Sequence, residues 1–206
     1  MTTVGRWSPN KVRARVLDGT WASPPEELGG MVLLTPTSIA YSGTSASIGT
    51  NGSVSATACS ILELRGVFLA DYDNYMVTIS TSSGAPAAVN AQFLSGTTPI
   101  TGSNYVRQYL FVDSTSVTAG RGGATTSFRI HEDDGAQSVG TVVYFYGPYL
   151  AQPTAMRTVE ANDYSSAVIL DSASTHSLSA SYDGFKLETT ANNITGLVSV
   201  FGLVGA

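Results

Sequence analysis

Charged residues are scarce in this sequence: only 12% of its 206 positions are Asp, Glu, Lys or Arg. A single cysteine, Cys59, excludes an intrachain disulfide framework, and its apolar surroundings predict a place in the core. No apolar run approaches the roughly 20 residues that a bilayer requires, so we predict no membrane span. The first residues lack the apolar segment of a signal peptide, and nothing predicts secretion.

Residues with catalytic chemistry are equally few. The only histidines are His131 and His176; the second lies in a polar stretch that is typical of a loop. The acidic residues after His131 suggest a metal loop, but Asp134-Gly135 between apolar segments is more typical of a hairpin turn. No nucleophile elbow, phosphate loop or dinucleotide fingerprint is present. We therefore predict a non-enzymatic protein without a metal or cofactor.

Short alternating segments dominate the rest of the chain. Tyr75, Val77 and Ile79 alternate with polar residues, as in a half-buried strand, and Gly-containing pairs such as Gly122-Gly123 are typical of turns. Residues 42–60 are rich in Ser, Thr, Gly and Ala, which fits either a weak edge strand or a long loop. The pattern predicts an all-β fold for residues 36–206: an antiparallel β-sandwich, jelly-roll-like, of about eight strands.

Residues 1–35 differ in composition and are predicted to form an extended N-terminal arm, with one short helix possible over residues 9–17. We predict that the arm attaches the protein to a partner, because cationic and aromatic side chains suit an acidic surface and desolvated anchor points. The alternative is that the arm packs on its own subunit. Nucleic acid is not an expected partner, since the body has no broad basic face. The predicted contact residues are Arg6, Trp7, Lys11, Arg13, Arg15 and Trp21.

Two segments resemble a known family. Residues 68–75 read Phe-Leu-Ala-Asp-Tyr-Asp-Asn-Tyr before an alternating strand, and residues 182–203 combine Tyr-Asp-Gly-Phe-Lys-Leu, an Asn-Asn turn and a last strand ending in Phe-Gly-Leu. This pattern resembles structural proteins of tailed bacteriophages, over about residues 60–206. The resemblance implies a minor tail, tail-fibre or head-fibre protein, a closing hairpin at the C-terminus, and a trimer. Tyr72 and Tyr75 are expected to form a structural corner rather than a ligand site.

The leading functional hypothesis is a structural virion protein of a tailed phage, at the tail or its tip. Its partners would be its own copies, other virion proteins through the arm, and a glycan or protein of the host surface. The alternatives are a capsid decoration or head-fibre protein, located on the capsid surface, and a carbohydrate-binding module. A sugar site would need exposed aromatics, but strand alternation favours the core for each candidate: Tyr105, Tyr109, Tyr144, Tyr146 and Tyr149.

Overall fold

The computed structural model describes residues 30–82, 88–113, 115–131, 139–162 and 168–204, and these form an all-β, antiparallel fold. The predicted fold class is confirmed, but the predicted number of about eight strands is wrong, because the described residues form a 14-stranded sheet. The strands are β1 (Met31–Leu34), β2 (Ser38–Ile48), β3 (Val54–Arg65), β4 (Asn74–Ser82), β5 (Val89–Ser95), β6 (Thr98–Pro99), β7 (Tyr105–Asp113), β8 (Ser116–Thr125), β9 (Phe128–His131), β10 (Val139–Tyr146), β11 (Gln152–Asn162), β12 (Ile169–Ala180), β13 (Gly184–Thr189) and β14 (Ile194–Leu203).

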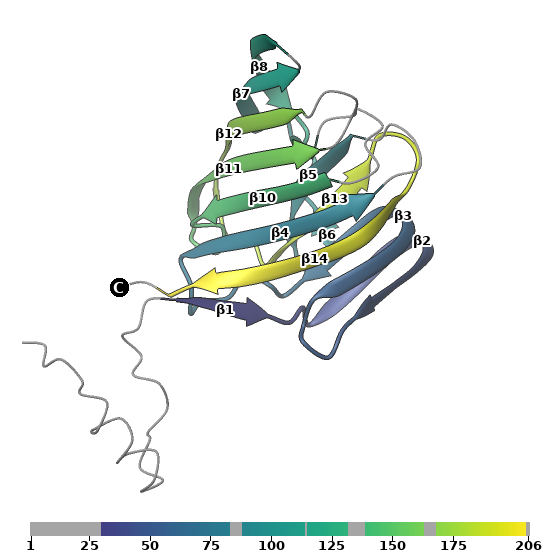
Figure 1. Ribbon diagram of the computed structural model, residues 1–206. Coiled ribbons are helices and arrows are strands. Elements are labelled where there is room, and N and C mark those ends of the chain that lie inside the picture. The colour runs from purple at the N-terminus through teal and green to yellow at the C-terminus, as the bar shows by residue number, and fades with distance from the viewer. Residues whose placement is uncertain (1–29, 83–87, 114, 132–138, 163–167, 205–206) are drawn as a thin grey trace, which may run out of the picture.

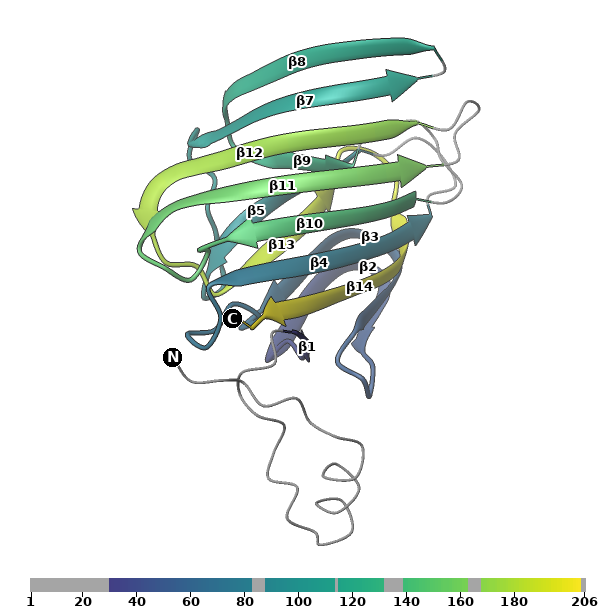
Figure 2. The ribbon, with the colours of Figure 1, turned by 60° about the vertical axis from the view of Figure 1, so that its left-hand side comes forward.

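The sheet curls into two layers (Figures 1 and 2). The front layer runs β14-β4-β10-β11-β12-β7-β8, and the back layer contains β2, β3, β13, β5, β6 and β9. Strand β3 links them, since its first half pairs with β14 and its second half pairs with β13. The β7–β8 hairpin is therefore the far end of the front layer, where the pocket described below lies.

The core between the layers is aromatic, and it follows from the alternation seen in the sequence. Tyr75, Val77 and Ile79 of β4 are all buried, as predicted. Phe93 of β5 stacks on Tyr182 with 4.7 Å between ring centroids, and Phe145 of β10 packs against Phe93 at 5.6 Å. Side chains from both layers thus meet in one continuous cluster, which removes large apolar areas from water.

The Tyr-Asp-Asn-Tyr segment forms the entrance to β4. The buried Tyr75 hydroxyl accepts a hydrogen bond from the Leu69 N–H at 2.6 Å and lies 2.6 and 3.0 Å from the carbonyl oxygens of Leu69 and Tyr72, to which it can donate. Tyr72 covers Gly202 of β14, where any Cβ would collide with its ring. These contacts are structural, so this corner matches the interpretation made from the sequence.

The predicted closing hairpin at the C-terminus is wrong. β13 and β14 follow each other in the chain but pair with different strands: β13 lies between β5 and β3, and β14 lies beside β4, β1 and the first half of β3. The turn around Asn192, whose φ is 55°, carries the chain from the back layer to the front layer. Apolar alternation is the same for either arrangement, because it identifies the buried face of a strand and not its partner.

Residues 42–60 form most of the β2–β3 pair, with β2 at the sheet edge, so the edge-strand alternative holds. The register of this pair shifts between Ser42 and Gly43, which leaves Ser60 of β3 as the extra residue of a bulge. Ala58 nearby has a φ of 48°. Cys59 is fully buried beside it, with Sγ 3.2 Å from the Ser45 carbonyl oxygen, which confirms the predicted core position.

The predicted hairpin around Asp134-Gly135 is also wrong in its pairing. Residues 132–138 are outside the described part, but the flanking strands are described: β9 pairs with β5, and β10 pairs with β4 and β11. The segment after His131 therefore connects the two layers instead of turning back on one strand.

The six predicted arm contacts and the possible helix at 9–17 lie outside the described residues. Met31–Leu34, within the segment assigned to the arm, pairs with β14 as an edge strand. The described residues contain no helix long and apolar enough to cross a membrane.

Candidate functional site

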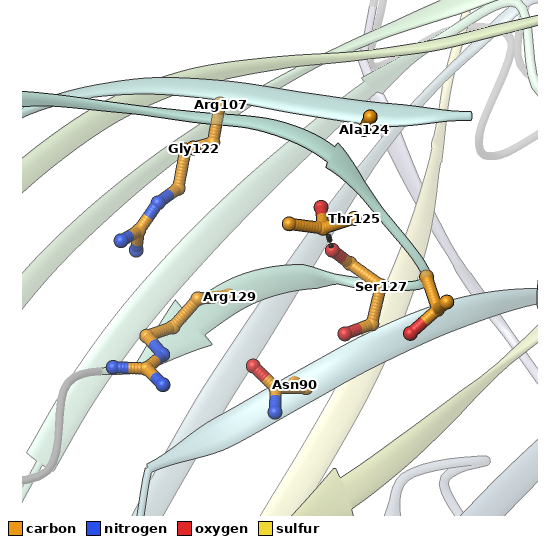
Figure 3. Close-up of a pocket in the computed structure, with 8 residues that line it drawn as sticks. Asn90, Arg107, Gly122, Ala124, Thr125, Ser127 and Arg129 are labelled. Atoms are coloured by element: carbon orange, nitrogen blue, oxygen red, sulfur yellow. Dashed lines mark hydrogen bonds between the residues drawn. The ribbon is translucent and has the colours of Figure 1, made fainter. Parts of the chain in front are cut away.

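A cavity of about 490 Å³ opens between the β7–β8 hairpin and the strands β5 and β9. Figure 3 shows two arginine side chains, Arg107 and Arg129, extending into it from opposite walls. A smaller cavity of about 200 Å³ shares both arginines and continues toward Phe111 and Thr118. The larger cavity is lined by Asn90, Arg107, Gly122, Ala124, Thr125, Thr126, Ser127 and Arg129.

The side of the cavity that β7 forms is explained by the alternation of side chains along this strand. Tyr105, Arg107, Tyr109 and Phe111 are two residues apart, so they share the inner face of the sheet. Tyr105 is fully buried and ties its hydroxyl to the Phe93 N–H and the Ile100 carbonyl oxygen, both at 3.0 Å. Burial raises the pKa of Tyr105, so its hydroxyl stays protonated at neutral pH. The inner end of β7 is therefore anchored in the core, and its outer part lines the cavity.

Glycines on β8 make room opposite these large side chains. The register pairs Arg107 with Gly122 and Tyr109 with Gly120. A Cβ at Gly120 would overlap the Tyr109 ring, whereas a Cβ at Gly122 would meet nothing within 4 Å. The Tyr109 ring thus fills the space above Gly120, and Gly122 leaves its part of the cavity open.

Arg107 is held over the Tyr109 ring, with its guanidinium carbon 4.3 Å from the ring centroid. Arg129 comes from β9, where its neighbours Phe128 and Ile130 are buried in the core and fix the strand. Asn90 of β5 is the register partner of Arg129 and lies beside it in the cavity. Two cationic groups and one amide are therefore presented from three different strands.

The turn from β8 to β9 is held by several hydrogen bonds. The Thr125 hydroxyl lies 2.8 Å from the Ser127 carbonyl oxygen and 3.0 Å from that of Tyr105. Gln92 donates its amide to the Thr126 carbonyl oxygen at 2.9 Å. This fixed geometry lowers the cost of ordering the turn around a ligand.

The inner face beside the cavity is polar. Ser174 is the register partner of Arg107, and Ser172 is that of Tyr109. Both serines are buried, and neither hydroxyl has a hydrogen-bond partner among the described residues. The buried hydroxyls of Thr141 on β10 and Thr154 on β11 likewise have no hydrogen-bond partner among the described residues. None of these four residues lines either cavity.

The two histidines are not in this cavity. His131 is buried at the end of β9, with Nδ1 3.0 Å from the fully buried Glu160, which also accepts from Asn162 at 2.9 Å. His176 was predicted in a loop but is fully buried in β12, and its Nδ1 lies 2.9 Å from the Tyr182 hydroxyl. Burial lowers the pKa of His176, because the charged imidazolium would lose its hydration. The loop prediction failed because the residues on both sides of His176 are mostly small and polar, so the sequence lacks the apolar alternation that is typical of a strand.

The sequence did not identify the cavity residues. Gly122-Gly123 was interpreted as a turn, which is wrong, since both residues lie within β8. Of the candidate tyrosines, Tyr105 is in the core as predicted, whereas Tyr146 and Tyr149 are 42% and 36% exposed, against the prediction. The available signal was glycine inside a strand, which marks a place where a ligand or another group can approach the backbone. The described residues include no group of three potential metal ligands.

Comparison with family models and with curated proteins finds no match. Among solved structures, a seed lectin isoform of Lotus tetragonolobus is similar over 87% of this chain and 100% of its own, with 9% identity and a TM-score of 0.22. A score this low carries no argument for fold or function.

Proposed function

We propose that the chain is a non-enzymatic structural protein of a tailed-bacteriophage particle, a minor tail or tail-tip component that assembles as a homotrimer. The observation that carries this proposal is the outer face of the front layer. This face carries several exposed apolar side chains and is covered by no other described part of the chain.

The apolar side chains of this face lie on adjacent strands. Leu110 of β7, Val159 of β11 and Ile169 of β12 are 53%, 38% and 50% exposed. Val159 and Leu110 are both register partners of Asp171, which lies between them, and Ile169 is two residues from Asp171 on the same face of β12. Exposed large apolar side chains grouped in this way favour burial against another chain.

A second copy suits this face because the face carries both signs of charge. Arg157 binds Asp171 through two hydrogen bonds of 3.2 and 2.7 Å, and this ion pair borders a shallow depression of about 480 Å³ lined by Leu110, Ala119 and Ala173. Contacts related by closed symmetry can place each charge near its opposite on a neighbour. The edge strand β8, with Val117 69% exposed, would be covered in the same assembly.

The phage role rests on the resemblance of residues 68–75 and 182–203, and the structural Tyr75 corner supports it. The burial of both histidines supports a non-enzymatic role. The arm would then bind other virion proteins. A capsid decoration or head-fibre protein is the alternative location for the same domain.

Quantitative mass spectrometry of purified particles of the encoding phage, with immunogold labelling of the chain, tests this proposal. A few to a few dozen copies with label on the tail support the tail role, and hundreds of copies with label on the head support the capsid alternative. Absence of the chain from purified particles would reject a structural virion role.

A further inference from the structure

We propose that, in the free protein, Trp21 of the N-terminal arm docks on an apolar strip of the outer face of its own chain. The strip lies at the opposite end of the front layer from Leu110 and Ile169, so docking does not use the side chains of the proposed oligomer contact. The proposal stands whether or not the chain belongs to a particle. The strip consists of outward-facing side chains of β1, β4, β10 and β14: Met31, Leu33, Met76, Tyr144, Tyr146 and Phe201.

One row of the strip crosses four neighbouring strands (Figure 1). Leu33 of β1 is the register partner of Phe201 of β14. Met76 of β4 is the next partner of Phe201, and it pairs in turn with Tyr144 of β10. All four side chains are partly exposed and lie outside the core cluster, whereas each has a chain neighbour inside that cluster, so alternation points the row outward. Three strand spacings make this apolar row about 14 Å long.

Two more exposed side chains widen the row. Met31 is 59% exposed and Tyr146 is 42% exposed. Each is two residues from a member of the row, Leu33 or Tyr144, and therefore shares its face of the sheet. Methionine side chains adapt their shape and make favourable contacts with aromatic rings, and tyrosine rings pack against other aromatic rings. The strip therefore suits a large aromatic side chain.

The arm begins at the edge of this strip. The Gly30 carbonyl oxygen accepts a hydrogen bond from the Val204 N–H at 2.9 Å, which fixes the start of β1 beside the end of β14. Trp21 is nine residues before Gly30, and an extended chain of that length spans up to about 30 Å. Trp21 can therefore reach every part of the strip. So short a tether also gives a high effective concentration, which favours docking on the same chain.

Charge complementarity supports the same docking. Asp71 and Asp73 are exposed immediately before β4. The Asp73 carbonyl oxygen accepts a hydrogen bond from the Gly147 N–H at 2.8 Å, which places both carboxylates near the end of β10. Residues 1–17 contain four cations and no acid. Arg15 is close enough in the sequence to the docked indole to meet these carboxylates, an exposed contact that adds a small stabilisation.

Tryptophan fluorescence tests the proposal directly, because Trp7 and Trp21 are the only tryptophans in the chain. The test uses the full chain with Trp7→Phe, so that Trp21 alone emits, and acrylamide as the quencher. A peptide of residues 1–29 with the same substitution gives the quenching of an undocked indole. We expect Trp21 of the full chain to be quenched less than Trp21 of the peptide. Equal quenching would overturn the proposal.

Substitutions in the strip test where the indole docks. Met76→Lys and Tyr146→Lys each place an ammonium group in the strip, and each should lower the ratio of docked to undocked arm by about tenfold. Tyr41→Lys is the matched control, because Tyr41 is 45% exposed on β2, away from the strip, and it should leave quenching unchanged. Circular dichroism identifies variants that fail to fold, and the exposed position of Tyr146 keeps one variant usable. A protected Trp21 in every folded strip variant would overturn the site.

Replacing both carboxylates separates the apolar contribution from the charge contribution. The double variant Asp71→Asn and Asp73→Asn should lower the docked ratio by only about threefold, because water screens exposed ion pairs. A larger loss in this variant than in Met76→Lys would overturn the apolar site in favour of an electrostatic one.

A mixing experiment tests whether the arm docks on its own chain. Chains that carry Trp21 and Met76→Lys are refolded with an excess of chains that carry Trp21→Phe and an intact strip, and Trp7→Phe is present in both. Trp21 should remain as open to acrylamide in the mixture as in the Met76→Lys chains alone. Renewed protection would show that the arm docks on a second copy, which would overturn docking on the same chain.

Discussion

The Tyr75 hydroxyl lies 2.6 Å from both the backbone nitrogen and the backbone oxygen of Leu69. One buried side chain thus closes the loop of residues 69–74 onto the start of β4. Because β4 pairs antiparallel with both β14 and β10, this corner lies beside the ends of those two strands. The Tyr-Asp-Asn-Tyr segment therefore has a physical role in the fold.

Replacing Tyr75 with Phe should lower the free energy of unfolding by about 1–3 kcal/mol, because it leaves buried backbone groups of Leu69 and Tyr72 without their partner. Chemical denaturation measures this loss. Tyr146→Phe is the control, since Tyr146 is 42% exposed on the outer face, and it should change stability by less than about 0.5 kcal/mol. Equal losses of stability in the two variants would contradict the structural role of the Tyr75 hydroxyl.

The same variant should alter the response to alkaline pH. Burial raises the pKa of Tyr75 to about 12 from the ordinary tyrosine value of 10.0. The folded state therefore keeps a proton that the unfolded state releases, and the stability due to this group is complete below pH 10 and is lost as the pH rises toward 12. The difference between wild type and Tyr75→Phe should shrink over that range.

A glycine in β14 is required by close strand contact. A Cβ at Gly196 would overlap the carbonyl oxygen of Ser80 on β4, and this backbone atom cannot rotate away. Gly196→Ala should therefore cost about 1–3 kcal/mol of stability. Gly140→Ala, whose nearest neighbour would be an oxygen 4.0 Å away, should be neutral or stabilising by up to about 1 kcal/mol. Chemical denaturation measures the free energy of unfolding of both variants. Unchanged stability in Gly196→Ala would contradict the close contact between β14 and Ser80.

Much of the fold could be predicted from alternation alone. The buried faces around Val77, Phe128 and Phe185 were identified correctly, because a period of two residues marks which side of a strand meets the core. Strand pairing could not be predicted. β13 and β14 each pair with strands that are distant in the sequence and not with each other. No local sequence pattern distinguishes this long-range pairing from a hairpin.

The candidate site was harder to predict for the same reason. Arg107 and Arg129 belong to strands that do not pair with each other, and they meet only because the sheet curls. Each arginine alone resembles an ordinary exposed residue of a half-buried strand. Gly122 is the local feature that could have suggested a binding surface, and a Gly-Gly pair is more often a turn.

His176 gives a prediction at acidic pH. Its lowered pKa means that, as the pH falls, the unfolded state takes up a proton before the folded state does, starting near the ordinary histidine pKa of 6.5. Stability should therefore fall as the pH drops below about 6.5, by at most about 1.4 kcal/mol per pH unit from this group. The imidazole NMR signals of His176 should titrate with a midpoint below 6.5, and a midpoint at or above 6.5 would contradict its burial beside Tyr182.

Deleting residues 1–29 tests the predicted attachment arm and leaves β1 intact. The truncated protein should keep its melting temperature within a few degrees but fail to enter phage particles. A fall of roughly 10 °C or more would instead indicate that Trp7 and Trp21 belong to the core. Normal incorporation of the truncated protein would exclude the arm as the attachment element.

Introducing charge on the outer face of the front layer should break the oligomer. Wild type is expected to have about three times the monomer mass of 21.4 kDa by light scattering. A double change of Leu110→Lys and Val159→Lys places two ammonium groups beside Asp171, which the monomer tolerates because all three positions face solvent. In an oligomer that buries this face, the same groups would lose their hydration, so the double variant should be a folded monomer.

Tyr41→Lys is the matched control for this experiment, because Tyr41 is 45% exposed but lies on β2, away from the front layer. It should leave the trimer intact. If the control dissociates and the double variant stays trimeric, the interface lies on the back layer. A monomeric wild type at micromolar concentration would reject the homotrimer itself, since the exposed side chains of Leu110, Val159 and Ile169 would then be stable in water without a partner.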